Sequence, residues 1–240
     1  GKEHSITVVG DGVQFSFTPS NPWVAVGWRI PAAIQVEVPA HLAKKGIAFE
    51  SAGAERLEPD ANQVRLRDGR TLSYDYLVIA TGPRLAFDEV PGLGPEGGFT
   101  QSICTTPHAH DAWLAYQAFL ENPGPIVVGA AAGASCFGPA YEFAMILDAD
   151  LRKRKLRDKV PMTFVTSEPY IGHMGLGGVG DSKGLLESQF RQRHIKWITN
   201  ARITGVRAGE MDVAEMDAKG EPLQTHALPF KYSMVLPAFT

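Results

Sequence analysis

Hydrophobic and polar positions in the first fifty residues predict a strand, a helix and a second strand. Residues 6–9 are apolar and extended in pattern, and they run into a Gly-containing loop. Residues 39–45 have a helical pattern that ends at Gly46, where a left-handed C-terminal cap is expected. Residues 47–50 form the next short strand. This order is typical of a βαβ unit with parallel strands.

Two further strand patterns follow in the first half of the chain. Residues 64–67 alternate apolar and charged side chains and meet Asp68 and Gly69, the strongest short signal for a β-hairpin. Residues 76–80 have no polar position, which is typical of a strand covered on both faces in a mostly parallel sheet. We therefore expect a surface hairpin followed by a buried strand.

The second half repeats the alternation of strands and helices. Thr106 is the expected N-cap of a helix that continues with Pro107 at its first position. The later elements are expected at residues 126–128 (strand), 139–156 (helix), 162–165 (strand), 181–194 (helix) and 195–198 (strand), followed by a β-meander at 203–206, 211–216 and 223–228 and a last strand at 234–236. Residues 83–100 are rich in Gly and Pro, so we predict a first domain over residues 1–100 and a second over residues 101–240.

Composition narrows the class of protein. With 240 residues, 44% of them hydrophobic and 20% charged, the chain is expected to be soluble and globular. A net charge of -3 without a dense basic block argues against nucleic-acid binding. No apolar run approaches the roughly 20 residues of a membrane span, and residues 1–20 lack the layout of a signal peptide. Both ends of the pattern look internal to a larger fold.

The turn after Val128 has the context of a phosphate-binding loop, because a strand, a Gly-rich turn and a helix follow one another. The G-x-G-x-x-G fingerprint is incomplete, however, since Ala131 and Ala134 follow Gly129 at the other glycine positions. Glu168 also lies too far past its strand for the usual ribose ligand. We expect the second half to have kept the dinucleotide fold without its nucleotide. The turn after Val128 then has only a structural role.

Cys136 is the principal candidate for chemistry. It lies just before a helix whose first residue is expected to be Pro139, where the helix dipole lowers a thiol pKa and favours the thiolate. Glu142, one turn into the helix, is near enough in sequence to exchange protons with a group bound there. Structural burial of the thiol, and a partnership of Glu142 with the helix dipole, are the alternatives.

Three other candidate groups are less specific. Cys104 precedes a helix and is followed by His108, a pairing that suits thiol activation, although His108 could simply face solvent. His173 lies in a Gly-rich loop of a kind that often carries function. Residues 20–24 join a turn to Trp23, which could lie against a flat cofactor or belong to the core. The spacing of Cys104 and Cys136 matches no metal site.

These segments together closely resemble the bacterial sulfide:quinone oxidoreductases. The resemblance rests on residues 20–24, 80–83, 102–105, 133–142 and 167–173. It implies an α/β flavoprotein with two dinucleotide-binding, Rossmann-like three-layer domains of the glutathione-reductase type, of which the first is incomplete in this chain. It also implies FAD as the cofactor, with contacts from Ser20, Asn21, Pro22, Trp23, Ala80, Thr81 and Gly82.

The resemblance also implies a reaction and its residues. Such enzymes oxidise hydrogen sulfide to sulfur or polysulfide and pass two electrons to a membrane quinone, ubiquinone or menaquinone. Cys136 corresponds to one of a redox pair of cysteines, and Cys104 to an auxiliary cysteine. His108 and His173 correspond to histidines that assist proton handling or quinone reduction, and Glu142 to a nearby acid. No metal is implied.

The family's intact glycine fingerprint is expected before Gly1, and its third cysteine, quinone site and membrane-docking helices after Thr240. The full-length protein is thus expected at the bacterial inner membrane as a peripheral protein, with oligomer formation left open. The chain alone is expected not to turn over and to hold no FAD. Three alternatives remain: the flavin subunit of a flavocytochrome c sulfide dehydrogenase, a type II NADH:quinone dehydrogenase, and a non-catalytic dinucleotide-fold domain.

Overall fold

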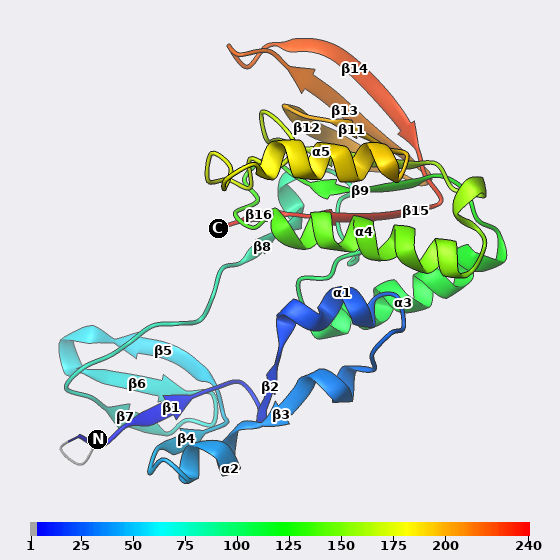
Figure 1. Cartoon of the computed structure of the whole chain (residues 1–240). Helices are drawn as coiled ribbons and strands as arrows, with labels where there is room; N and C mark the ends of the chain where they lie inside the picture. The colour runs from blue at the N-terminus through cyan, green and yellow to red at the C-terminus, as the bar shows by residue number, and fades with distance from the viewer. Residues whose placement is uncertain (1–3) are drawn as a thin grey trace. The chain divides into compact units, whose positions relative to one another are not determined.

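The computed structural model describes residues 4–240 and separates into two compact units (Figure 1). Unit 1 contains the described part of Gly1–Phe17 together with Ala32–Gly82, and unit 2 contains Thr18–Pro31 and Pro83–Thr240. The Gly- and Pro-rich residues 83–100 therefore pack with unit 2. The boundary at residue 100 stays a prediction. Within residues 4–240, we find no helix with both the length and the apolar character needed to cross a membrane.

Unit 1 contains the predicted βαβ unit. Strands β1 (Thr7–Val9) and β4 (Ala48–Glu50) pair in parallel, and helix α2 (Val38–Ala43) lies between them in the chain. Gly46 follows the helix with a φ of 69°, the left-handed conformation that a residue without Cβ adopts at little cost. These features confirm the expected strand, helix and cap.

Short antiparallel strands complete unit 1. The predicted hairpin is confirmed, because β6 (Gln63–Leu66) and β7 (Thr71–Ser73) pair across Asp68 and Gly69. The remaining strands are β2 (Gln14–Ser16), paired with β3 (Gln35–Glu37), and β5 (Ala54–Glu58), paired with β6.

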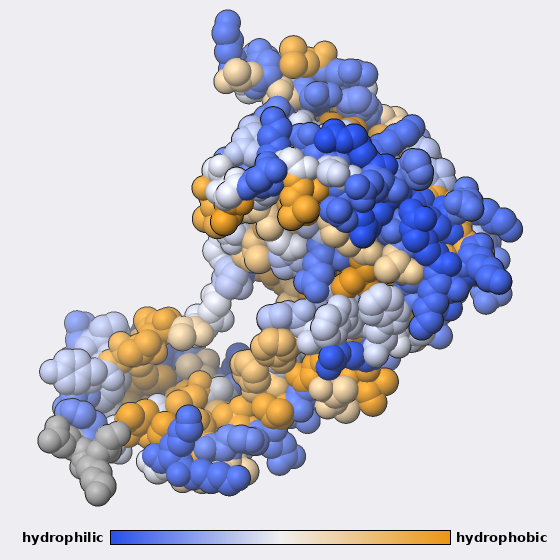
Figure 2. All heavy atoms as spheres, in the orientation of Figure 1, coloured by the Kyte–Doolittle hydropathy of each residue, from blue (hydrophilic) through white to orange (hydrophobic). Residues whose placement is uncertain are grey.

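The buried strand predicted at residues 76–80 is wrong for this structure. The segment has no strand conformation, and Tyr76 and Val78 are 92% and 86% exposed. A strand forms only where neighbouring strands take up its backbone groups, and no strand among residues 4–240 pairs with this segment. Exposed apolar side chains are frequent elsewhere in unit 1 (Figure 2), including Phe15 and Phe17.

Unit 2 is built on a four-stranded parallel sheet in the order β11–β10–β9–β15 (Figure 1). Its strands are β9 (Ile126–Ala130), β10 (Met162–Thr166), β11 (Ile195–Ile198) and β15 (Tyr232–Leu236). Every residue of the central strand β9 is buried, as expected for a strand covered on both faces, and every residue of β15, at the end of the order, is buried as well. The predicted strands of the second half are confirmed.

Three helices accompany this sheet. They are α3 (Thr106–Glu121), α4 (Gly138–Lys153) and α5 (Ser182–Gln192). The expected starts need two corrections: Thr105, not Thr106, caps α3 by accepting the His108 amide, and α4 begins at Gly138, one residue before Pro139. Thr105 is the cap because its extended backbone turns its hydroxyl toward the free amides of the first turn.

An antiparallel meander of β12 (Ala201–Arg207), β13 (Glu210–Met216) and β14 (Pro222–Pro229) packs beside the sheet, as predicted. Its inward residues, including Ile203, Met211 and Val213, form one apolar cluster with Val127, Val165 and Leu93. Leu93 comes from the loop after β8 (Leu85–Ala86), a short strand that pairs with β16 (Ala238–Phe239). The cluster therefore fixes residues 85–98 to unit 2.

A buried carboxylate joins three helical segments of unit 2. Asp150, on α4, is 1% exposed and accepts hydrogen bonds from Tyr116 on α3 at 3.0 Å, from the Trp28 indole at 2.9 Å and from Arg154. Trp28 follows the short helix α1 (Asn21–Val24). A buried charge is tolerated only where its acceptor positions are used, and here three donors use them.

We expect Asp150→Ala to lower the free energy of unfolding by about 1 to 3 kcal/mol, because it leaves the buried Tyr116 hydroxyl without its acceptor. The other two donors, Trp28 and Arg154, are exposed enough to bond to water instead. Asp111→Ala changes an exposed aspartate on α3 and is the control, with an expected change within about 0.5 kcal/mol. Urea unfolding followed by circular dichroism measures both values. Equal losses in the two variants would contradict the assigned role of Asp150.

Candidate functional site

Two free cysteines lie ahead of two helices of unit 2. Cys104 stands two residues before α3, and Cys136 stands two residues before α4. Cys136 is exposed, whereas Cys104 is half-buried. Both helices have 16 residues, so each thiol lies near a group of unpaired backbone amides that favours negative charge.

The two thiols share one electrostatic environment. Burial is the main cause that raises the pKa of Cys104, a hydrogen bond with Ser102 lowers that pKa, and negative charge on Cys136 raises it. A negative charge on Cys136 therefore opposes ionisation of Cys104, so the two thiols are electrostatically coupled. Of the two thiols, the exposed Cys136 has the greater access to solvent.

Ser102 connects Cys104 to His108. Ser102 is fully buried, and its Oγ accepts the Cys104 amide at 3.1 Å and lies 3.3 Å from His108 Nδ1. On the other side of the ring, His108 Nε2 lies 3.6 Å from a carboxylate oxygen of the exposed Glu96. The predicted pairing of Cys104 with His108 is therefore indirect, through a serine that the sequence did not single out.

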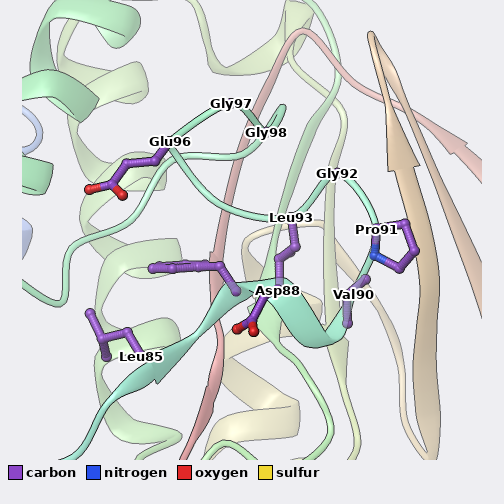
Figure 3. A pocket seen from close by; sticks show the side chains of 10 residues that line it. Leu85, Asp88, Val90, Pro91, Gly92, Leu93, Glu96, Gly97 and Gly98 are labelled. Carbon is purple, nitrogen blue, oxygen red and sulfur yellow. The ribbon is translucent and has the colours of Figure 1, made fainter.

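A pocket of about 410 Å³ opens beside this histidine. Figure 3 shows its lining, which comes from residues of the loop between Leu85 and Gly98. Two lining residues also contact His108: Phe87, whose ring centroid is 6.0 Å away in an edge-on arrangement, and Glu96. The pocket therefore shares Phe87 and Glu96 with the surroundings of His108.

Glu142 lies on α4, in the turn that follows Cys136. Partial burial raises the pKa of its carboxyl group above the ordinary value. No hydrogen-bond partner is found for this side chain among the described residues. A carboxyl group in this position can keep a proton to higher pH than a free glutamate.

The loop that carries His173 lies against the start of α4. A Cβ placed on Gly138 would lie 3.8 Å from Met174 Cε, and one on Gly175 would lie 3.3 Å from the Phe137 ring. The His173 ring packs edge-on against Tyr170 with centroids 5.2 Å apart. Because Phe137 and Gly138 directly follow Cys136, the structure brings the His173 loop to the same helix start.

The segment that contains α1 binds the backbone and side chains next to Cys104. Asn21 is fully buried; its amide donates to the Ile103 carbonyl at 2.9 Å and its Oδ1 accepts from Thr106 at 3.1 Å. Ser20 and Pro22 are also buried. Trp23 is partly exposed, with the Arg29 guanidinium 4.5 Å above its ring. Asn21 therefore binds the residues on either side of the Cys104–Thr105 pair. The position of Asn21 in a turn did not indicate this role.

The other expected cofactor segment, residues 80–82, belongs to unit 1. Ala80, Thr81 and Gly82 are exposed, and Gly82 has a φ of 75° with open space where a Cβ would be. Their backbone groups are accessible. The structure describes the two expected cofactor segments in separate units and gives no arrangement of one against the other.

The turn after β9 is filled by the protein itself. A Cβ on Gly129 would lie 2.1 Å from the Val165 carbonyl oxygen, so glycine is needed there for strand packing. The Ala131 amide donates to the Leu236 carbonyl at 2.8 Å, and Ala134 is buried. These residues serve the contact between strands.

Comparison with known proteins identifies the family of the chain. No family model matches it. It is 45% identical over 234 residues to the sulfide-quinone reductase of Aquifex aeolicus, covering 98% of this chain and 52% of that protein. The X-ray structure of the Aquifex aeolicus sulfide:quinone oxidoreductase superposes with a TM-score of 0.91 at 44% identity over 100% of this chain and 54% of that one. The chain belongs to the sulfide:quinone oxidoreductase family.

Other relatives extend this assignment. The mitochondrial sulfide:quinone oxidoreductase of Mus musculus is 26% identical over 198 residues, covering 80% of this chain and 42% of that protein. The NAD-dependent persulfide reductase of A. fulgidus, with a TM-score of 0.67 and 20% identity, shares the fold and covers 100% of this chain and 42% of that one. The predicted α/β fold class is confirmed. The chain spans about half the length of the curated relatives that it matches.

We expect iodoacetamide to modify the exposed Cys136 more readily than Cys104, and the onset for Cys104 to lie at raised pH, because burial and the Cys136 charge hold the pKa of Cys104 above the ordinary value. Ser102→Ala removes the hydrogen bond that favours the Cys104 thiolate and should move that onset further up. Peptide mass spectrometry across a pH series measures both cysteines separately. A lower onset for Cys104 than for Cys136 would refute this order.

Proposed function

We propose that this chain supplies the sulfur-handling half of an FAD-dependent enzyme that oxidises hydrogen sulfide and passes electrons to a membrane quinone. The observation that carries the proposal is the exposed Cys136 at a helix start, in one electrostatic site with Cys104. The 45% identity to the Aquifex aeolicus sulfide-quinone reductase supports it. An accessible thiol at this position can form a persulfide with the sulfur of sulfide, a step that releases two protons and two electrons, and the electrons would pass to the flavin.

The residues of this chain fit the roles that the reaction requires. Cys136 holds the sulfur while sulfide sulfur is oxidised to the sulfane level, and the half-buried Cys104 is the auxiliary thiol. Glu142 is the group best suited to hold a proton, because its pKa is raised. His108 and His173 move protons at the Cys104 side and the Cys136 side of the site.

FAD fits what the structure offers, although each unit contributes separately. The exposed backbone of residues 80–82 can approach a cofactor, and Trp23 presents a partly open ring from unit 2. Ser20, Asn21 and Pro22 are buried and would support that contact from beneath. The flavin, when bound, supplies an acceptor for the two electrons lost by sulfide.

A nicotinamide dinucleotide fits poorly in unit 2. The Ala131 amide is used by Leu236, and Glu168 is 2% exposed with its carboxylate already accepting from Tyr141 and Thr166. Neither group is free for a pyrophosphate or a ribose hydroxyl. This argues against the NADH:quinone dehydrogenase alternative.

The proposal includes partners outside this chain. They are hydrogen sulfide, and ubiquinone or menaquinone as the electron acceptor at the surface of the bacterial inner membrane. Quinone reduction and membrane attachment belong to the full-length protein, of which this chain resembles about half.

In the full-length protein, Cys136→Ser should lower the rate of flavin reduction by sulfide by at least about 10³-fold, because an alcohol at this site is a far weaker nucleophile than a thiolate. Ser135→Ala changes the exposed neighbouring residue and is the matched control, with a rate expected within a factor of about two. Stopped-flow absorbance of the flavin measures both. Sulfide oxidation that survives Cys136→Ser, or faster flavin reduction by NADH than by sulfide, would overturn the proposal.

The chain of 240 residues alone should purify with far less than one FAD per chain, because the segments expected to contact the cofactor belong to separate units. Flavin absorbance together with the intact mass gives the ratio. Stoichiometric FAD would contradict this expectation.

A further inference from the structure

Glu168 is a buried acid at the carboxyl end of the sheet that the reaction proposed above does not use. It follows β10 and is 2% exposed. One carboxylate oxygen accepts from Tyr141 at 2.6 Å and from Thr166 at 2.7 Å, and the other accepts from the Met174 amide at 2.5 Å. Three donors from three segments therefore meet on one carboxylate.

Tyr141 carries the connection into helix α4. Its hydroxyl donates to Glu168 and accepts from the Gly172 amide at 3.0 Å. Its ring is stacked on Phe164 of β10, with centroids 4.5 Å apart, and near Phe190 of α5 at 5.7 Å. The ring is held by packing, so its hydroxyl is a fixed point of attachment for the loop.

The loop needs this attachment because its backbone is strained. Met174 has a φ of 58°, a left-handed conformation that costs a residue with a Cβ on the order of 1 to 2 kcal/mol. Gly172, with a φ of 86°, would carry a Cβ 2.7 Å from the Ser182 carbonyl oxygen. Glu168 accepts the Met174 amide, and the Tyr141 hydroxyl accepts the Gly172 amide. These two hydrogen bonds hold the backbone on either side of His173.

The fixed loop touches the helix start that carries Cys136. The Met174 methyl group lies over Gly138, and Gly175 lies against the Phe137 ring. Both contacts depend on the backbone course between Gly172 and Gly175. Tyr170, which packs against the His173 ring, is tied across the loop by its hydroxyl, which donates to the Gly177 carbonyl at 2.7 Å.

We propose that Glu168 and Tyr141 are positioning residues, which hold the His173 loop against the Cys136 segment and so set His173 for proton transfer during sulfide oxidation. The catalytic part of this inference rests on the proposed function. The acid that follows the second strand of a dinucleotide fold is well placed to hold a ribose, and in this chain it holds a loop of its own protein instead.

The anchoring is tested by amide hydrogen exchange, with a matched pair of variants of this chain. Tyr141→Phe removes the hydroxyl that binds Gly172 and Glu168. Tyr116→Phe removes an equivalent buried hydroxyl that donates to Asp150, away from the loop. We expect Tyr141→Phe to speed exchange in residues 170–178 about tenfold or more relative to the rest of unit 2, and Tyr116→Phe to leave that loop unchanged.

The functional part is tested by a double-mutant cycle in the full-length flavoprotein. Tyr141→Phe should lower kcat for sulfide oxidation about tenfold and leave the KM for quinone unchanged. In a His173→Ala background the same substitution should have almost no further effect, because it acts through that histidine. Glu168→Gln, which retains one acceptor oxygen for Met174, should give a smaller loss than Tyr141→Phe.

The outcomes separate the two levels of the inference. Faster exchange spread evenly over unit 2 in Tyr141→Phe would overturn the anchoring. Loop-specific exchange with additive effects of Tyr141→Phe and His173→Ala would overturn the positioning of His173. A wild-type protein that shows no sulfide oxidation would overturn the proposed function, and the exchange experiment would still decide the anchoring.

Discussion

The close parallel contact of β9 with β10 is the constraint on which the site depends. The strands pair residue for residue from Ile126 beside Met162 to Ala130 beside Thr166, and Gly129 lets the two backbones approach where any Cβ would strike the Val165 carbonyl. Parallel strands end at the same edge of their sheet. The turn that leads to Cys136 and the turn that contains Glu168 must therefore leave that edge side by side.

Two buried carboxylates then hold helices and loops in fixed positions relative to this sheet through hydrogen bonds. Asp150 binds donors of α3, α4 and the segment after α1, so it fixes the helices that follow Cys104 and Cys136. Glu168 binds α4 and the His173 loop. Each acid is costly to bury, and each is stabilised because every neighbouring donor faces it. The residues with reactive groups are thus held by residues that have no part in the chemistry.

The sequence predicted most of unit 2, but it did not predict how the candidate site is held together. Strand and helix patterns are local, so the sheet and meander followed from periodicity and turn residues. Ser102, Asn21 and Glu168 act through contacts with residues far away in the chain or with loop amides, and no local pattern reports such contacts. Residues 76–80 show the opposite error, a local pattern that predicted too much. Their apolar run is suited to a strand between neighbouring strands, and no strand of unit 1 pairs with it among the described residues.

The carboxyl edge of the sheet relates nucleotide binding in this fold to the thiol chemistry that we propose. In a dinucleotide fold, the amides at this edge face a phosphate. Here Leu236 uses the Ala131 amide, and Glu168 uses the Met174 amide. The exposed Cys136 lies two residues before the start of α4, at the same edge. The start of a helix favours negative charge, whether that charge is on a bound phosphate or on sulfur. Protein contacts thus fill the nucleotide site, while the start of α4 still favours negative charge, which is the feature that the proposed sulfur chemistry requires.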